Sequence, residues 1–202
     1  MGNMEKILVI VLSGAPSSGK TTAFRQLAAD AELGSKILFV EESAAELIPI
    51  HEMRDDDAFD KLPMEAQQSF QRLVAAHSVH KSFLARRRAE RLGKRIVIFD
   101  RHTLDGAGYL KGGVSELLSV TGMTVTDLIA GVDHVLFLAA PPEAHYVINT
   151  YRFEPYAFAL KRGEGVYRAW SDHHPDVTVI DGDTWPAKYA NLVAEIRRLM
   201  NL

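Results

Sequence analysis

The chain has 202 residues, of which 47% are hydrophobic and 24% charged, and its formal net charge is −3. This length fits one domain with a sizeable core, and the near-average composition argues against disorder, a coiled coil or collagen-like repeats. The absence of cysteine excludes disulfides, a thiolate nucleophile and cysteine-ligated zinc or iron–sulfur centres, and the slightly acidic balance gives no general attraction to nucleic acid.

The first hydrophobic segment of the chain is ILVIVL at residues 7–12. It is shorter than the ~7–15 residues of a secretory signal core and leads into a glycine–lysine motif instead of a cleavage site. No segment reaches the ~18 apolar residues that cross a bilayer. We therefore expect a buried β-strand here, in a cytoplasmic protein without a membrane segment.

Four more short apolar runs follow, and like the first they are nearly continuous and rich in β-branched or aromatic residues. Such runs are typical of parallel strands that are covered on both faces. They lie at residues 37–40, 96–99, 135–139 and 177–180. Helical patterns lie between them, at residues 20–31, 43–50, 63–92, 126–129, 142–150, 164–171 and 186–200. The alternation of strands and helices predicts a single α/β domain over residues 1–202.

The segment GAPSSGKT at residues 14–21 matches the phosphate-binding pattern G-x-x-x-x-G-K-[ST] in full. It follows a predicted buried strand and begins a predicted helix, which is the setting that the pattern requires. Glycines permit the backbone angles that turn successive N–H groups toward phosphate oxygens, and the helix N-terminus adds partial positive charge. The candidate nucleotide-binding residues are Gly14, Ala15, Pro16, Ser17, Ser18, Gly19, Lys20, Thr21 and Thr22.

Two side chains of this loop have distinct expected roles. In loops of this kind the lysine, here Lys20, reaches the β- and γ-phosphates of ATP, and the Thr21 hydroxyl is a ligand of Mg²⁺. A carboxylate that holds the metal directly or through water is expected at the end of another strand. Asp100 follows the apolar run 96–99 and fits this place, with Arg101 directly after it. The alternative is that these two residues form an exposed ion pair.

Two adjacent acids, Glu41 and Glu42, follow the second predicted strand. Either could deprotonate or orient an attacking hydroxyl or water, or could favour the start of the helix at 43–50, where negative charge is stabilising. Neighbouring residues of a strand point to opposite faces, so only one of them is expected to face the nucleotide. We favour Glu42.

These motifs resemble the P-loop kinase-like proteins, in particular small AAA-type ATP-binding domains near the nucleoside, nucleotide and nicotinamide-riboside kinases. Residues 14–22 look like their phosphate loop, 42–48 like their second-strand element and 100–109 like their third-strand element. Residues 134–140 resemble the strand before their lid, and 151–154 the Arg-x-Glu at its start. The resemblance covers most of the chain.

The resemblance implies a five-stranded parallel sheet in the order 2-3-1-4-5, flanked by helices, and a short helical lid at about residues 150–168. Lid arginines in such enzymes stabilise charge on the transferring phosphoryl group. The basic residues in this stretch are Arg152, Lys161, Arg162 and Arg168. A solvated charged face is the other interpretation of these four residues.

The implied function is transfer of the γ-phosphoryl group of Mg²⁺·ATP to a small metabolite such as a nucleoside or nucleotide. Its expected catalytic residues are Lys20, Glu42, Asp100, Arg101 and Arg152. The alternative is an ATPase switch that acts through a protein partner. The predicted long helix has no arginine at residues 73–80, where thymidylate kinases grip the substrate phosphate, which argues against a thymidylate acceptor. The oligomeric state stays open.

Three polar residues of the predicted long helix, Gln71, His77 and His80, could line an acceptor pocket. A structural or exposed role is the commoner one for histidine. The basic run at 86–95 is explained by the C-terminus of the same helix, where cations offset exposed carbonyls. No aromatic residues lie within that run to stack bases, so we expect no nucleic-acid partner.

Overall fold

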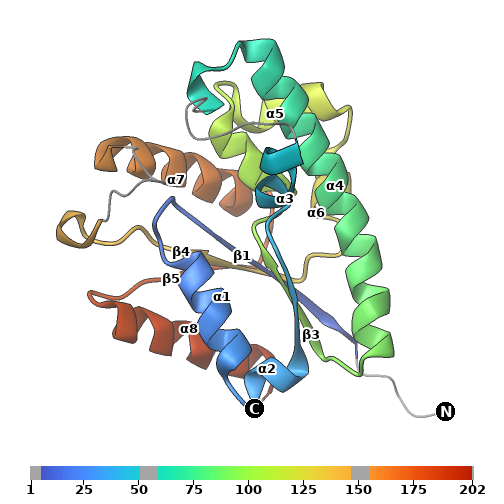
Figure 1. Cartoon of the computed structure of the whole chain (residues 1–202), viewed down its shortest axis with the longest axis vertical. Helices are drawn as coiled ribbons and strands as arrows, with labels where there is room; N and C mark the ends of the chain where they lie inside the picture. The colour runs from blue at the N-terminus through green and yellow to red at the C-terminus, as the bar shows by residue number, and fades with distance from the viewer. Residues whose placement is uncertain (1–5, 51–58, 147–154, 202) are drawn as a thin grey trace.

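The computed structural model describes residues 6–50, 59–146 and 155–201 (Figure 1). Five strands form one parallel sheet in the order β2-β3-β1-β4-β5, which confirms the predicted fold class. The strands are β1 (Leu8–Gly14), β2 (Ile37–Val40), β3 (Ile96–Asp100), β4 (His134–Leu138) and β5 (Val177–Ile180). Arg152, one of the predicted catalytic residues, lies outside the described residues.

Helices cover both faces of this sheet. On one face lie α1 (Lys20–Ala29), the short α2 (Leu33–Lys36) and α8 (Trp185–Leu199), and on the other lie α4 (Met64–Arg91), α5 (Gly113–Thr121), α6 (Val125–Ile129) and α7 (Tyr156–Ser171) (Figure 1). The remaining elements are α3 (Ser43–Ile50) and the 3₁₀ segments η1 (Phe59–Lys61), η2 (Thr103–Tyr109) and η3 (Glu143–His145). None of the described helices is both long and apolar enough to pass through a bilayer.

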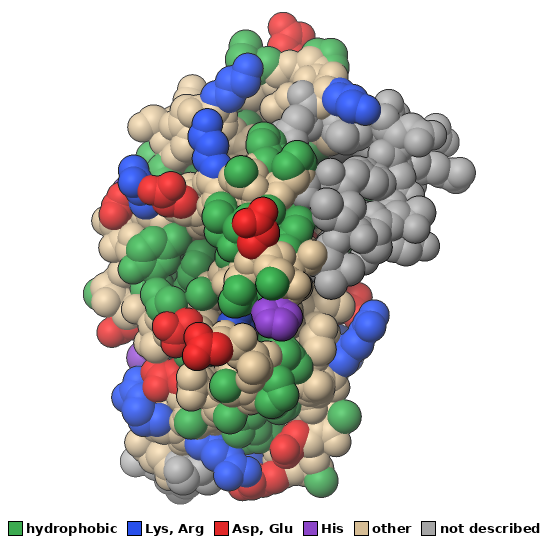
Figure 2. Space-filling view, turned by 90° about the vertical axis from the view of Figure 1, so that its left-hand side faces the viewer, with side chains coloured by type: hydrophobic (Ala, Val, Ile, Leu, Met, Phe, Trp, Pro, Cys, Tyr) green, Lys and Arg blue, Asp and Glu red, His purple; other side chains and the backbone are tan. Residues whose placement is uncertain are grey.

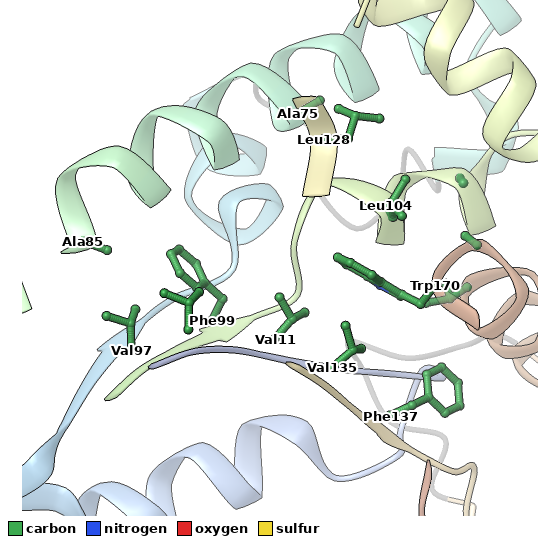
Figure 3. Packing of buried hydrophobic residues seen from close by; sticks show 14 of the residues in the cluster. Val11, Ala75, Ala85, Val97, Phe99, Leu104, Leu128, Val135, Phe137 and Trp170 are labelled. Atoms are coloured by element: carbon green, nitrogen blue, oxygen red, sulfur yellow. The ribbon is translucent and has the colours of Figure 1, made fainter. Parts of the chain in front are cut away.

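The two faces of the sheet carry separate hydrophobic cores because side chains alternate along each strand. In β1, Val9 and Val11 belong to the core under α4, α5, α6 and α7, whereas Ile10 and Leu12 belong to the core under α1, α2 and α8. Figure 3 shows the first core, in which the fully buried Trp170 ring of α7 projects over the sheet. Burial on both faces explains why the strands appear in the sequence as unbroken apolar runs.

The structure corrects two of the predicted helices. The predicted helix at 142–150 is only the single 3₁₀ turn η3 within the described residues, since Tyr146 already has an extended backbone. The helix predicted at 164–171 begins eight residues earlier, at Tyr156. Helices α2 and α5 and the segment η2 were not predicted. Helix α2 has only four residues and η2 contains two glycines, whereas in α5 the residues Val114, Leu117 and Leu118 do have helical spacing.

Gly163 and Gly165 lie in α7 where the helix approaches other backbone segments, and Gly163 directly precedes the stretch that was predicted as helical. A Cβ atom on Gly163 would lie 2.6 Å from Cβ of Ala15 in the loop after β1. A Cβ atom on Gly165 would lie 3.4 Å from Cα of Gly108 in η2, an ordinary contact distance. Helix α7 is thus packed directly against the loop that follows β1, and Gly163 is the residue that permits this approach.

We predict opposite effects on stability for alanine at these two positions. Alanine is favoured over glycine in a helix by about 1 kcal/mol, so Gly165→Ala should raise the free energy of unfolding. In Gly163→Ala the new methyl group overlaps Ala15, and overpacking of this kind costs about 1–3 kcal/mol, so this variant should be less stable than the parent chain. Urea unfolding of the three proteins measures both effects, and equal stabilisation by the two substitutions would contradict the close packing of α7 on the loop.

Candidate active site

The loop between β1 and α1 has a backbone that only certain residues tolerate. Gly14 and Gly19 have φ angles of 148° and 97°, and Ser17 has a φ of 61°. A Cβ atom on Gly14 would lie 2.4 Å from the Leu138 carbonyl oxygen, and one on Gly19 would lie 2.3 Å from the Trp185 ring. The two glycines of the sequence motif are therefore required both by conformation and by space.

Lys20 begins α1 and is 7% exposed. Its Nζ donates hydrogen bonds to the carbonyl oxygens of Gly14 (3.1 Å) and Ala15 (2.8 Å) and to Oγ of Ser18 (3.2 Å). Burial, together with the nearby positive charge of Arg101, lowers the pKa of Lys20 to about 7. The ammonium group thus lies within the loop itself, among carbonyl oxygens that a phosphate oxygen would replace as its partners.

The other nucleotide-binding residues predicted from the sequence lie near Lys20 along the chain. Pro16 and Ser17 are half-buried, and Thr21 and Thr22 follow Lys20 in the first turn of α1 with exposed side chains. The hydroxyl of Thr21 is therefore accessible to a ligand that binds the loop.

Asp100 is the last residue of β3 and lies beside Leu12 of β1 in the sheet. It is 8% exposed, and its Oδ1 has no hydrogen-bond partner among the described residues. Burial and the negative charge of Glu42 raise the pKa of Asp100 to about 6. A carboxylate oxygen that is buried and unpaired is costly unless a cation or a donor reaches it.

Arg101 connects the ends of three strands. Its Nη1 donates to the carbonyl oxygen of Gly14, the last residue of β1 (3.1 Å), and to Oδ1 of Asp105 in η2 (3.1 Å). Its Nε lies 3.2 Å from Oε1 of Glu42, which follows β2. Its own φ is 59°, a left-handed conformation that is uncommon for a residue with a side chain. Several contacts therefore hold this arginine at the edge of the phosphate loop.

The structure distinguishes the two acids after β2. Glu42 is paired with Arg101, and its charge raises the pKa of Asp100, so its carboxylate is close to the loop. Glu41 is exposed, and its carbonyl oxygen accepts a hydrogen bond from Lys81 of α4. The geometry thus places Glu42, rather than Glu41, beside the other predicted site residues.

Asp105 also belongs to the site, although the sequence assigned it no role. It was noted only as part of segment 100–109, which resembles the third-strand element of the kinase-like proteins. It is 2% exposed, and its two carboxylate oxygens accept hydrogen bonds from four groups of the surrounding elements. Only its spacing of four residues from Arg101 was visible in the sequence, and that spacing becomes an ion pair because η2 turns back directly after β3.

A cavity of about 200 Å³ lies next to Arg101, between α3, η1, α4 and η2. Hydrophobic and aromatic side chains form most of its wall, and the rings of Phe59, Phe70 and Tyr109 contact one another there. Its lining residues are Glu42, Ser43, Ala44, Ile48, Phe59, Phe70, Gln71, Val74, Ser78, Arg101, His102, Asp105, Gly106 and Tyr109. Mostly apolar walls with a few polar groups are typical of a small-molecule pocket.

Of the three α4 residues considered for an acceptor pocket, the cavity includes only Gln71. His77 lies 3.4 Å from Glu46 through its Nε2, and His80 is exposed. The described residues contain no group of three or more histidine, aspartate or glutamate side chains suited to hold a metal ion.

The basic residues at 155–168 have different surroundings. Arg162 is buried between two rings, with its guanidinium carbon 4.4 Å from the centre of Tyr109 and 4.7 Å from that of Phe158. Arg168 is exposed and paired with Glu164 one turn away, and Lys161 is exposed. Arg162 is therefore the basic residue of described α7 that is held against the candidate site.

A second hollow, of about 380 Å³, lies on the other side of Ala15 and is lined mainly by apolar side chains of β4, β5 and α7. Hydrophobic side chains gather on this side of the molecule, with charged ones among them (Figure 2). Leu160, Tyr167 and Val179 are among its exposed members. Ala15 of the phosphate loop thus borders this apolar hollow.

We predict that Asp100→Asn makes the protein more stable at pH 8. An acid whose pKa is raised from 3.8 to about 6 on folding binds more protons in the native state, so the chain loses stability as pH rises from about 4 to about 6. At about 1.4 kcal/mol per pKa unit this loss is at most about 3 kcal/mol, and asparagine avoids it. Urea unfolding of both proteins at pH 4 and pH 8 should show the difference only at pH 8.

Asp127 provides a control variant in which the pKa shift has the opposite direction, because hydrogen bonds from Thr124 lower the pKa of Asp127. Asp127→Asn should therefore slightly reduce stability at pH 8. A stability difference between Asp100→Asn and the parent chain that does not depend on pH would contradict the raised pKa of Asp100.

Comparisons with known proteins agree with this geometry. The chain is similar to a NadR protein whose crystal structure is in complex with NR, at a TM-score of 0.68 and 20% identity, over 97% of this chain and 52% of that one. A NadR protein in complex with NAD and AMP-PNP matches at a TM-score of 0.64 and 18% identity, over 97% and 50%. The chain thus spans about half the length of these structures, and no curated protein matches it. Because residues 9–188 match the family described as AAA domain (AAA_28), the chain belongs to this family, and it is a P-loop kinase-like protein.

Proposed function

We propose that the chain transfers the γ-phosphoryl group of ATP to a hydroxyl group of a nucleoside-like acceptor. The observation that carries this proposal is the cavity beside the phosphate loop, which shares Arg101 and Glu42 with the loop's surroundings. A protein that only hydrolyses ATP needs no second binding cavity at this place. A kinase needs one, because its acceptor must meet the terminal phosphate with water excluded.

The lining of the cavity favours an uncharged acceptor with an aromatic part. Among the described lining residues Arg101 is the only cation, and its charge is already balanced by Glu42 and Asp105. No described lining residue is therefore left to neutralise an acceptor phosphate. The rings of Phe59 and Tyr109 provide a surface on which a planar base can pack. A nucleoside fits this lining better than a nucleotide, and the NadR structure in complex with NR supports nicotinamide riboside as the first compound to test.

The residues around the phosphate loop suit Mg²⁺, the metal that such kinases use. Thr21 offers an accessible hydroxyl, and Asp100 offers a buried carboxylate oxygen that lacks a donor. When bound with ATP, the ion would neutralise phosphate charge. The loop amides and Lys20 would hold the β- and γ-phosphates, with Lys20 exchanging its carbonyl partners for phosphate oxygens.

Glu42 and Arg101 are the proposed groups at the reacting centre. The acceptor oxygen would bond to the γ-phosphorus as the bond to the ADP oxygen breaks, and Glu42 would take the hydroxyl proton. Arg101, together with basic residues such as Arg152 and Arg162, would stabilise charge on the transferring group. The role of Arg152 is an inference from the family resemblance alone.

The reaction is tested by ADP production from Mg²⁺·ATP in the presence of single acceptors. We expect turnover to require a nucleoside, with nicotinamide riboside and the common nucleosides as the first panel. The corresponding 5′-monophosphates should give kcat/KM values at least about tenfold lower, because the cavity has no free cation among its described lining residues. Lys20→Ala should abolish turnover.

The outcomes separate the proposal from its main rival. Steady ATP hydrolysis that no acceptor stimulates would favour an ATPase switch, and preference for monophosphates would refute the proposed acceptor class. The phosphorylated product, identified by mass spectrometry, distinguishes true transfer from stimulated hydrolysis.

The neighbouring acids provide a matched pair of variants. Glu42→Gln removes the proposed proton acceptor and should lower kcat by about 10²-fold or more, with the KM for ATP changed by less than about threefold. Glu41→Gln makes the same chemical change on an exposed neighbour and should leave kcat within about twofold. Steady-state kinetics of the two variants checks the assignment, and equal losses in both would contradict it.

A further inference from the structure

Asp105 joins three separate parts of the molecule through one buried carboxyl group. Its Oδ1 accepts hydrogen bonds from Ser13 Oγ in β1 (2.7 Å) and from Arg101 Nη1 (3.1 Å). Its Oδ2 accepts from the backbone N–H of His102 (3.1 Å) and from Trp170 Nε1 in α7 (3.0 Å). The Asp105 carboxylate is therefore the acceptor in all four hydrogen bonds, two at each oxygen.

This arrangement requires a carboxylate. Asparagine has the same shape, but one of its two terminal atoms is an NH₂ donor. At the Oδ2 position that NH₂ would face the His102 N–H and Trp170 Nε1, and both hydrogen bonds would be lost. At the Oδ1 position it would face the Arg101 guanidinium, which has no acceptor, so the bond to Arg101 would be lost even though the Ser13 hydroxyl could turn to accept. The side chain is 2% exposed, and water cannot readily replace the missing partners.

The guanidinium of Arg101 depends on this carboxylate for its position. The arginine follows β3 with a φ of 59°, so its backbone is in a conformation that side-chain contacts must stabilise. Of its partners among the described residues, Glu42 is the proposed proton acceptor and Gly14 belongs to the phosphate loop, where Lys20 also binds the same carbonyl oxygen. Asp105 is the partner that takes no part in the proposed reaction itself.

We propose that Asp105 is the positioning residue of this site, which holds Arg101 between the phosphate loop and the acceptor cavity. Trp170 donates to the other oxygen of the same carboxylate, so the position of Arg101 is also linked to α7, which packs on the phosphate loop at Gly163. This assignment rests on the proposed kinase function, whereas the placement of Arg101 by Asp105 can be measured without turnover.

A double-mutant cycle in kcat tests the assignment. Asp105→Asn should lower kcat by about 10–100-fold, with the KM for ATP changed by less than about threefold. In an Arg101→Ala background the same substitution should change kcat by less than about threefold, because its effect passes through the arginine. Ser13→Ala, which also removes one hydrogen bond to Asp105 but leaves the pair with Arg101, should keep kcat within about threefold. Equal losses from Asp105→Asn in both backgrounds would overturn the assignment.

An NMR measurement on the chain without nucleotide keeps the test independent of activity. The Nη–H signals of Arg101, identified by their absence in Arg101→Lys, should exchange with water at least about tenfold faster in Asp105→Asn than in the parent chain, because Nη1 is the atom that donates to Asp105. In Ser13→Ala the rate should stay within about threefold. An unchanged exchange rate in Asp105→Asn would overturn the positioning role. If the exchange rates are as expected but the parent chain shows no acceptor-dependent turnover, only the kinase function is refuted.

Discussion

The four hydrogen bonds to the buried Asp105 carboxylate are the constraint on which the site depends. They connect β1, the turn after β3 and helix α7 at one point, because Ser13, His102 and Trp170 all donate to the same side chain as Arg101. The elements come from distant parts of the chain, and each would otherwise leave a polar group buried without a partner. One carboxylate thus fixes both a local turn and the contact of α7 with the sheet.

Two ionisable groups beside the phosphate loop carry charges that burial makes unfavourable. The pKa of Lys20 is lowered to about 7 and that of Asp100 is raised to about 6, and burial is the largest cause of both shifts. The folded chain therefore holds a cation and an acid in an environment that opposes their charged forms. Perturbed pKa values of this kind are common at functional sites. A bound phosphate group would give the Lys20 ammonium an anionic partner, and a cation would give one to the unpaired oxygen of Asp100.

Close backbone approach explains much of the remaining architecture. Gly14 brings the phosphate loop against β4, and Gly163 brings α7 against Ala15 of the same loop. The loop is consequently held from two sides, with a cavity near Arg101 and an apolar hollow beyond Ala15. The reactive groups can then be placed on segments whose own backbones are fixed by packing, which is what positioning of a substrate requires.

The sequence by itself determined the strands, the phosphate loop and the fold. The predicted runs 37–40 and 177–180 coincide with β2 and β5, since both are short runs rich in β-branched or aromatic residues. The loop motif is equally local, because its glycines and lysine serve a backbone shape made by consecutive residues.

Tertiary structure alone decided the rest. Gly163 obscured the start of α7, and the reason for this glycine is its close contact with Ala15 in the distant phosphate loop. Similarly, nothing local separated Glu42 from Glu41 or gave Asp105 its importance, since both depend on which side chains of other elements come within reach. The acceptor cavity is likewise formed by α3, η1, α4 and η2 together, and no single segment carries its shape. Local pattern therefore determines elements and backbone motifs, whereas roles that arise from contacts between distant elements appear only when the chain is folded.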